Sequence, residues 1–337
     1  MAVRVAINGF GRIGRMVLRA AYESGRKDIQ IVAINDLADL ETNAFLLRHD
    51  SAHGAFPAEV KAEGGKLKIG DWPAIEVIQE KDPTKLPWGD MNVDVALECS
   101  GVFTDRDKAA HHLTAGAKKV LVSAPSKGAD MTMVVGVNED QIDPSYEVIS
   151  CASCTTNCLA PVAKVMQDTV GIERGYMTTV HSFTGDQRIV DTMHKDPRRS
   201  RAAANNMIPT STGAARAVGL VMPELAGKLD GAAVRVPTIN VSLVDFKFDA
   251  SNPTDADTVK QALIEASKSN RMKGILGISD EPLVSTDFNH NSHSSVVDIT
   301  ETHVIDKTFV RVMSWYDNEW GFSNRMADAA VKVGQVA

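Results

Sequence analysis

The chain has 337 residues, which exceeds the roughly 100 to 200 residues of one compact domain, so two cores are expected. Hydrophobic residues make up 44% and charged residues 23% of the sequence, values that exclude a disordered, collagen-like or coiled-coil chain. The net charge of −7 excludes a general basic surface for nucleic acid, despite a local basic run over 194–201.

The first third of the sequence alternates short apolar runs with a helical pattern. We expect a strand over Val3–Ile7, a helix over Arg12–Ser24 and a strand over Ile29–Asn35. This β-α-β order is typical of a parallel sheet covered by helices, and it predicts an α/β domain of the Rossmann type.

A glycine motif lies between the first strand and the first helix. Gly9, Gly11 and Gly14 form GxGxxG, whose backbone can approach a pyrophosphate at the N-terminus of a helix. Asp36 ends the second strand, where a carboxylate can bond both hydroxyls of an adenosine ribose and repel a 2′-phosphate. The motif therefore predicts a dinucleotide site that prefers NAD to NADP.

Two more buried strands are expected at Val93–Glu98 and Lys119–Val122, and small residues follow both. Beyond residue 150 the pattern changes to longer alternating strands, as in Val241–Phe248 and Phe309–Tyr316. We therefore expect an α+β second domain with a mixed or antiparallel sheet. The final helical stretch, Asn318–Val333, fits either domain.

Cysteines gather in one segment, SCASCTTNCLAP, over 150–161. Cys154 falls near a predicted helix N-terminus, a position that lowers the pKa of a thiol, and Thr155 and Thr156 can donate hydrogen bonds beside it. This arrangement predicts a thiolate nucleophile.

Two other interpretations of the cysteines remain. The CxxCxxxC spacing lacks the second pair of ligands that a zinc site requires, so no metal is expected. Packing suits Cys158, one helical turn beyond Cys154, and Cys99, which we place in a buried strand. Packing stays an alternative for Cys154 as well.

A thiol nucleophile needs a base, and His181 ends the predicted strand MTTVH. Strand ends are common positions for catalytic side chains in such domains. The chain has nine histidines, and any one of them can be an ordinary surface or core residue, so spacing alone does not decide.

Seven segments in the same order resemble the phosphorylating glyceraldehyde-3-phosphate dehydrogenase family: INGFGRIGR, SCASCTTNCLAP, VHSFTGDQ, RRSRAAA, PTSTGAA, RVPTINVS and WYDNEWGFSNR. The resemblance runs from residue 3 to the last helix. It implies an NAD-binding Rossmann domain over 1–152, a catalytic domain over 153–317, and a C-terminal helix over 318–337 that returns to the first domain. It also implies a homotetramer.

The resemblance implies a glycolytic or gluconeogenic reaction. Cys154 is the nucleophile and His181 the base, and the aldehyde of glyceraldehyde 3-phosphate becomes a thioester that inorganic phosphate converts to 1,3-bisphosphoglycerate. The residues implied for the attacking phosphate are Ser153, Thr155, Arg199, Thr212 and Gly213. Those implied for the phosphate of the substrate are Thr184 and Arg235.

The resemblance also implies contacts with NAD. These positions are Gly9, Gly11, Arg12, Ile13, Gly14, Asp36, Lys81, Ser123 and Asn318. Thr192 and Met193 stand where NAD-specific members of the family have Leu and Pro, so use of NADP as well as NAD stays open.

Two rival functions remain. An erythrose-4-phosphate dehydrogenase shares the cysteine and histidine but releases its product with water. A non-catalytic relative would bind dinucleotide or RNA, although this acidic sequence has no basic and aromatic RNA motif.

The location is expected to be the cytoplasm. The opening residues MAVRVAINGF do not form a leader, no apolar run reaches the roughly 18 residues that cross a bilayer, and four cysteines are too few for a secreted disulfide framework. No membrane and no specific nucleic acid is expected as a partner.

Overall fold

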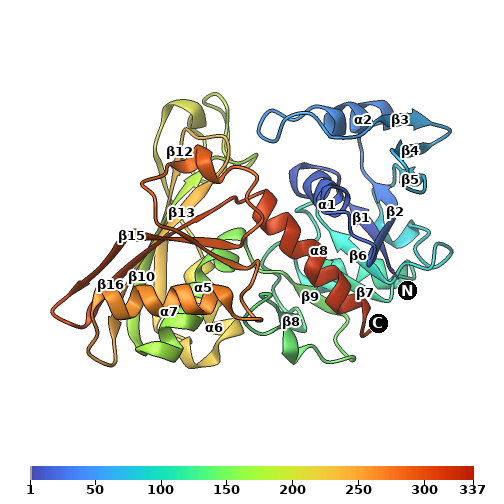
Figure 1. The fold of residues 1–337 in the computed structure, drawn as a ribbon. Coiled ribbons are helices and arrows are strands. Elements are labelled where there is room, and N and C mark those ends of the chain that lie inside the picture. The colour runs from blue at the N-terminus through green and yellow to red at the C-terminus, as the bar shows by residue number, and fades with distance from the viewer. Residues whose placement is uncertain (1) are drawn as a thin grey trace. The chain divides into compact units, whose positions relative to one another are not determined.

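The computed structural model describes residues 2–337. The chain up to Ala152, together with Ser323–Ala337, forms one compact unit, called unit 1 below. Ser153–Phe322 forms a second, called unit 2. Figure 1 labels the helices and strands of both.

Unit 1 is built on a nine-stranded sheet with the order β3-β4-β5-β2-β1-β6-β7-β9-β8. Its parallel strands are β1 (Val3–Asn8), β2 (Ile29–Asn35), β5 (Ile75–Ile78), β6 (Val95–Glu98), β7 (Lys119–Val122), β8 (Met131–Thr132) and β9 (Val148–Ser150). An antiparallel edge is formed by β3 (Val60–Glu63) and β4 (Lys66–Ile69).

The helices of unit 1 that precede unit 2 in the chain are α1 (Arg12–Glu23), α2 (Leu40–Arg48), α3 (Arg106–Ala109) and α4 (His111–Thr114). Every residue of β6 and β7 is buried, as expected for parallel strands whose two faces are both covered. The strand β1 lies between β2 and β6, so the strand order changes direction there. A ligand crevice is expected at the carboxyl ends of these strands.

Unit 2 is built on a seven-stranded sheet with the order β11-β12-β10-β13-β16-β15-β14. The strands are β10 (Ile172–Ser182), β11 (Ile208–Ser211), β12 (Leu229–Val236), β13 (Ser242–Ala250), β14 (Leu276–Ser279), β15 (Ser295–Ile305) and β16 (Phe309–Tyr316). Two of the pairs, β10 with β12 and β14 with β15, are parallel, and the others are antiparallel. The predicted mixed sheet is therefore confirmed.

One face of this sheet carries helices. Alternate residues of β13 are buried, which is the pattern of a strand with one face on a core. The helices α5 (Cys154–Thr169), α6 (Ala214–Val221) and α7 (Ala256–Lys268) lie against the sheet, and α5 contacts the other two (Figure 1).

The last helix, α8 (Trp320–Gly334), begins in unit 2 and ends in unit 1. A Cβ atom on Gly334 would lie 2.2 Å from a methyl group of Val3, so the absence of a side chain lets the end of α8 meet β1. Within residues 2–337 no helix is both long enough and apolar enough to cross a membrane.

Candidate active site

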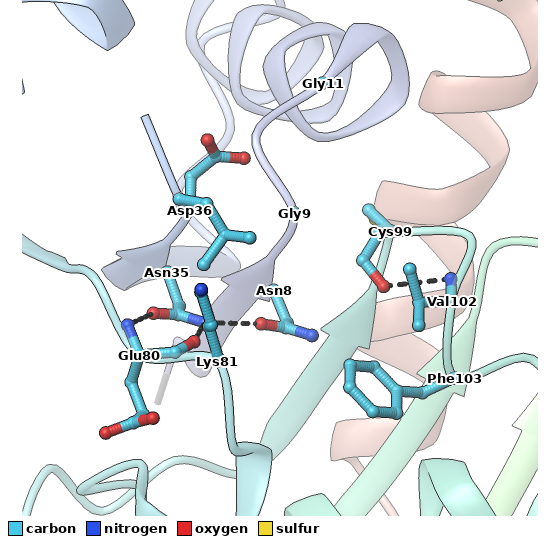
Figure 2. A pocket seen from close by; sticks show the side chains of 12 residues that line it. Asn8, Gly9, Gly11, Asn35, Asp36, Glu80, Lys81, Cys99, Val102 and Phe103 are labelled. Carbon is cyan, nitrogen blue, oxygen red and sulfur yellow. Dashed lines mark hydrogen bonds between the residues drawn. The ribbon is translucent and has the colours of Figure 1, made fainter. Parts of the chain in front are cut away.

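The glycine motif of unit 1 lies beside a pocket of about 360 Å³. The pocket is lined by Asn8, Gly9, Gly11, Asn35, Asp36, Leu37, Glu80, Lys81, Cys99, Ser100, Val102 and Phe103. These residues lie at the ends of β1 and β2 and in the segments after them and after β5 and β6, and Figure 2 shows how most of them are placed. The crevice therefore lies where the strand order changes direction.

The three glycines have different physical reasons to lack a side chain. A Cβ atom on Gly9 would lie 2.5 Å from the Cα of Ser100, and one on Gly14 would lie 2.1 Å from the carbonyl oxygen of Gly9. A Cβ atom on Gly11 would meet nothing within 4 Å, and this residue faces the pocket. No side chain caps α1, whose N-cap is Gly11. Open space at an uncapped helix N-terminus fits a dinucleotide pyrophosphate.

Asp36 is fixed in the pocket by two backbone donors. Its carboxylate accepts hydrogen bonds from the N–H of Phe10 at 2.7 Å and from the N–H of Ala38 at 2.9 Å. Each carboxylate oxygen has further lone pairs for ligand hydroxyls. The position and chemistry of Asp36 fit the ribose contact that the sequence predicts.

Not all of the predicted cofactor residues line this pocket. Gly9, Gly11, Asp36 and Lys81 do. Arg12, Ile13, Gly14 and Ser123 are not among the residues that line it, and Asn318 belongs to unit 2.

Arg12 instead forms an ion pair with Asp50, whose side chain is 1% exposed. Burial raises the pKa of this carboxyl group. The charge and hydrogen bonds of Arg12, with the N–H groups of His53 and Ala52, outweigh burial and hold the pKa at about 2.

The prediction that Cys99 lies within a buried strand is wrong. β6 ends at Glu98, and beyond Cys99 the N–H of Ser100 donates to the side chain of Glu98 instead of to a neighbouring strand. Cys99 is half-buried and lines the pocket. Burial raises the pKa of its thiol, so it is not a reactive thiolate.

In unit 2, Cys154 is the first residue of α5, as the sequence predicts. Ser153 is the N-cap, and its hydroxyl accepts a hydrogen bond from the N–H of Thr156 at 3.0 Å. The Sγ atom of Cys154 lies 3.5 Å from Nε2 of His181, which is 3% exposed and sits at the end of β10. The proposed nucleophile and base are therefore in hydrogen-bond contact.

The helix N-terminus does lower the pKa of Cys154, through backbone hydrogen bonds at Thr155 and Cys154, but the net shift of this pKa is upward, opposite to the expected direction. Burial raises the pKa of the thiol, and this effect exceeds the lowering by Arg235 and by the hydrogen bonds from Thr155. Burial, together with the charge of Arg235, lowers the pKa of His181 to about 3. Both groups are therefore neutral at pH 7 when each is considered alone.

Arg235 reaches the far side of His181 because the two residues are paired in the parallel strands β10 and β12. Nη1 of Arg235 lies 2.7 Å from Nδ1 of His181 and 3.0 Å from the carbonyl oxygen of Ser182. Nδ1 also lies 2.7 Å from that oxygen. Arg235 bonds Nδ1 only when Nδ1 lacks a proton, whereas Ser182 requires a proton there. The two contacts thus correspond to the two tautomers of the imidazole.

A second basic group lies in the segment between β10 and β11. The guanidinium of Arg199 donates to the hydroxyl of Thr210 at 2.6 and 2.8 Å and to the carboxylate of Asp186 at 2.6 Å. The amide of Gln187 also donates to Asp186, at 3.1 Å, and its oxygen accepts from the N–H of Thr184 at 3.0 Å. Asp186 and Gln187 therefore connect the two residues predicted for different phosphates.

The N-termini of α5 and α6 are joined by one hydrogen bond, from the hydroxyl of Thr156 to the carbonyl oxygen of Ala214 at 3.2 Å. Gly213 is the N-cap of α6, and the hydroxyl of Thr212 accepts from the N–H of Ala214 at 3.1 Å. Two helix N-termini at one place favour an anion, as the predicted phosphate role of Thr212 and Gly213 requires.

Asn318 follows β16, and its amide oxygen accepts hydrogen bonds from the hydroxyls of Ser182 and Ser242, at 2.9 and 2.8 Å. These two bonds fix the orientation of the amide. Its NH₂ group is then the part that can donate to a ligand such as a carboxamide.

Sequence reasoning missed Tyr316 and Asp186. The hydroxyl of Tyr316 lies 2.9 Å from the hydroxyls of both Thr155 and Thr179, and its ring stands edge-on to that of His181 at 5.9 Å between centroids. Burial raises the pKa of this phenol well above 10, so it acts as a neutral hydrogen-bond group. The signal for Tyr316 was its place at the end of a strand beside the DNEWG motif.

Residues 3–106 match the NAD binding domain of glyceraldehyde 3-phosphate dehydrogenase, and residues 153–318 match the C-terminal domain of the same enzyme. Curated proteins named glyceraldehyde-3-phosphate dehydrogenase are 61% identical in Xanthobacter flavus and 59% identical in Cereibacter sphaeroides, with all of both chains covered. One from Zymomonas mobilis is 55% identical, with 99% of each chain covered. The chain belongs to the glyceraldehyde-3-phosphate dehydrogenase family.

Membership of this family confirms the resemblance found in the sequence, the Rossmann and α+β fold class, NAD as cofactor, and NAD-dependent oxidation of glyceraldehyde 3-phosphate. The 61% identity extends over the whole chain. The match is therefore not confined to the dinucleotide-binding fold, which many other enzymes share.

Proposed function

We propose that the chain converts glyceraldehyde 3-phosphate, inorganic phosphate and NAD to 1,3-bisphosphoglycerate and NADH through a thioester on Cys154. The observation that carries the assignment of residues is the 3.5 Å contact between Sγ of Cys154 and Nε2 of His181. Because burial disfavours a free thiolate, the sulfur needs a base within hydrogen-bond reach, and His181 is that base.

The chemistry then follows from the two side chains. Sulfur bonds to the aldehyde carbon as its proton passes to Nε2 of His181, and His181 then gives that proton to the carbonyl oxygen, which forms a hemithioacetal and leaves the imidazole neutral. His181 removes the hydroxyl proton as the carbon loses a hydride. NAD, when bound, accepts that hydride. An oxygen of inorganic phosphate attacks the resulting thioester carbon, the carbon–sulfur bond breaks, and Cys154 is regenerated.

Anion binding is assigned to the predicted phosphate residues. Arg199, Thr212, Gly213, Ser153 and Thr155 hold the attacking phosphate, because a guanidinium and two helix N-termini suit it. Arg235 and Thr184 hold the phosphate of the substrate. An anion that draws Arg235 from Nδ1 of His181 favours the tautomer that donates to Ser182, and Nε2 then faces Cys154 as an acceptor.

The cofactor contacts are proposed at Gly9, Gly11, Gly14, Arg12, Ile13, Asp36, Lys81 and Ser123 in unit 1 and at Asn318 in unit 2. Units 1 and 2 correspond in this proposal to the NAD-binding and catalytic domains. Of the nine positions, the four that line the pocket of unit 1 have direct geometric support.

A homotetramer in the cytoplasm is also proposed. Four apolar side chains between β10 and β11 are strongly exposed: Ile189 at 81%, Val190 at 67%, Met193 at 88% and Met207 at 75%. Other copies of the chain are the proposed cover for them. Within residues 2–337 none of the four cysteines forms a disulfide, which fits a reducing compartment. Sedimentation of the purified protein as four chains is the expected result.

The deciding experiment is NADH formation from glyceraldehyde 3-phosphate with and without inorganic phosphate, with NADP in a parallel assay. Turnover that requires phosphate and NAD is expected. Turnover that is equally fast without phosphate means that water releases the product, as in an erythrose-4-phosphate dehydrogenase, and overturns the phosphate assignment of Arg199, Thr212 and Gly213.

A further inference from the structure

A buried carboxylate lies beneath the pocket of unit 1 and takes no part in the proposed reaction. Glu98 ends β6, and its side chain is 0% exposed. Four donors converge on it: the amide of Asn8 at 2.6 Å, Nε2 of His112 at 3.0 Å, the N–H of Ser100 at 2.7 Å and the hydroxyl of Ser100. None of the four is a lysine or arginine side chain, so amide, imidazole, backbone and hydroxyl hydrogens bond the carboxylate.

The tautomer of His112 is set by Trp88. The indole N–H of Trp88 donates to Nδ1 of His112 at 3.0 Å, and an indole nitrogen can only donate. Nδ1 is therefore an acceptor, and Nε2 carries the hydrogen that points at Glu98. Both rings are fully buried.

Hydrogen bonds continue from Glu98 across the carboxyl ends of the strands. Asn8 donates to Glu98, so its amide oxygen faces Asn35 and accepts from it at 2.7 Å. The oxygen of Asn35 in turn accepts from the N–H of Glu80 at 2.9 Å. Figure 2 shows the bonds that join Asn8, Asn35 and Glu80. A carboxylate at one end thus fixes the direction of both amides, because it can only accept.

The other oxygen of Glu98 controls the opposite wall of the pocket. It holds both the N–H and the hydroxyl of Ser100, and that hydroxyl accepts from the N–H of Val102 at 3.1 Å. Gly9 packs directly on Ser100, since a Cβ atom there would lie 2.5 Å from the Cα of Ser100. The carboxylate therefore fixes the turn that faces the glycine motif.

We propose that Glu98, oriented by His112, is a positioning residue of the cofactor pocket that fixes the amides of Asn8 and Asn35 on one wall and the turn at Ser100 on the other. Asn8, Asn35 and Ser100 line the pocket. Glu98 lies behind them, and His112 acts through Glu98. The inference rests on the proposed assignment of this pocket to NAD. It does not depend on the chemistry at Cys154.

The test compares dissociation constants for NAD, measured by calorimetry on purified full-length variants. Glu98→Gln keeps the size of the side chain, but its NH₂ group would face groups that themselves donate hydrogen bonds to Glu98. We expect the dissociation constant for NAD to rise about tenfold, as for loss of a hydrogen bond to a charged group. Amide hydrogens of Ser100 and Val102 are expected to exchange faster in this variant without NAD. The rate at which iodoacetamide alkylates Cys154 should not change.

Two controls separate positioning from general stability. Asp130 directly precedes the edge strand β8 of the same sheet, and its carboxylate accepts from Arg106 and from the N–H groups of Glu147 and Val148. Asp130→Asn should lower the melting temperature and leave the dissociation constant for NAD within twofold. His112→Gln keeps a donor to Glu98 and an acceptor for Trp88, so it should bind NAD nearly normally, whereas His112→Leu should not.

The proposal is overturned if Glu98→Gln folds and its dissociation constant for NAD is within twofold of the value for the original chain. Should Glu98→Gln not fold, equal affinities in the two His112 variants overturn it, because the donor would then have no role. Failure of the proposed dehydrogenase reaction would appear as lack of turnover with normal NAD binding, which is a separate result.

Discussion

The cofactor pocket of unit 1 and the thiol site of unit 2 are built on different principles. The pocket uses backbone, glycines and neutral amides, with Asp36 held by two N–H groups. The thiol site joins Cys154, His181 and Arg235, which are up to 81 positions apart in the sequence. In the first, the space left by missing side chains decides what binds. In the second, burial decides which protonation states are available.

The largest expected effect tests the division of work between the two sites. Cys154→Ser should reduce turnover roughly a thousandfold or more, because an alcohol is a far weaker nucleophile than a thiolate. The dissociation constant for NAD should not change. Cys158→Ser is the matched control, since Cys158 is buried one helical turn away and contacts the hydroxyl of Ser295. If both variants lose turnover equally, Cys154 is not the nucleophile.

His181→Asn is expected to lower turnover roughly a hundredfold or more, the usual contribution of a general base. Alkylation of Cys154 near pH 7 should also slow, because burial raises the pKa of the thiol and no base remains to take its proton. His303→Asn, at a side chain that is 59% exposed, provides the control. Unchanged alkylation in His181→Asn would mean that α5 alone activates the sulfur.

Asp36→Asn tests whether the pocket of unit 1 selects between NAD and NADP. Removing the charge weakens the bond to ribose hydroxyls and the repulsion of a 2′-phosphate, so the ratio of kcat/KM for NAD over NADP should fall about tenfold. Asp39→Asn is the control, because Asp39 caps α2 through the N–H of Thr42 and does not line the pocket. If the ratio of kcat/KM for NAD over NADP is unchanged in Asp36→Asn, then Asp36 does not select the nucleotide. Thr192 and Met193 would be the next residues to substitute.

The smallest effect concerns stability. Because the pKa of Asp50 is lowered to about 2, the ionised form stabilises the fold by about 2 kcal/mol above the unfolded pKa of 3.8, and this is lost as the pH falls toward 2. Asp50→Asn should therefore unfold at a lower urea concentration than the original chain from pH 5 to 8. The difference between the two urea midpoints should be constant over this range. A difference between the urea midpoints that grows below pH 4 would contradict the assigned ion pair with Arg12.

Much of the fold could be predicted because it is local in sequence. β1, α1 and β2 appear where the apolar periodicity and the glycines predict them, and β7 and β16 have the predicted bounds. The antiparallel edge of β3 and β4 was not predicted, since its four-residue strands have too little periodicity to detect. β3 pairs with β4 and β4 pairs with β5, and no local pattern in the sequence records these pairings.

The site could be predicted less completely, for a physical reason. A helix N-terminus is visible in the sequence around Cys154, but burial is a property of the whole fold, and burial reverses the expected direction of the thiol pKa. Tyr316 and Glu98 act through partners 161 and 90 positions away, Thr155 and Asn8. Only the fold brings these groups together.

The contact of Gly334 with Val3 has a consequence for biosynthesis. Unit 1 takes β1 from the part of the chain that precedes unit 2 and most of α8 from the part that follows it. While the ribosome is still making unit 2, the apolar surface that α8 covers has no partner in the chain. Unit 1 therefore reaches its final packing only after α8 has been translated, and a chain that stops before α8 would lack part of the core of the unit that was made first.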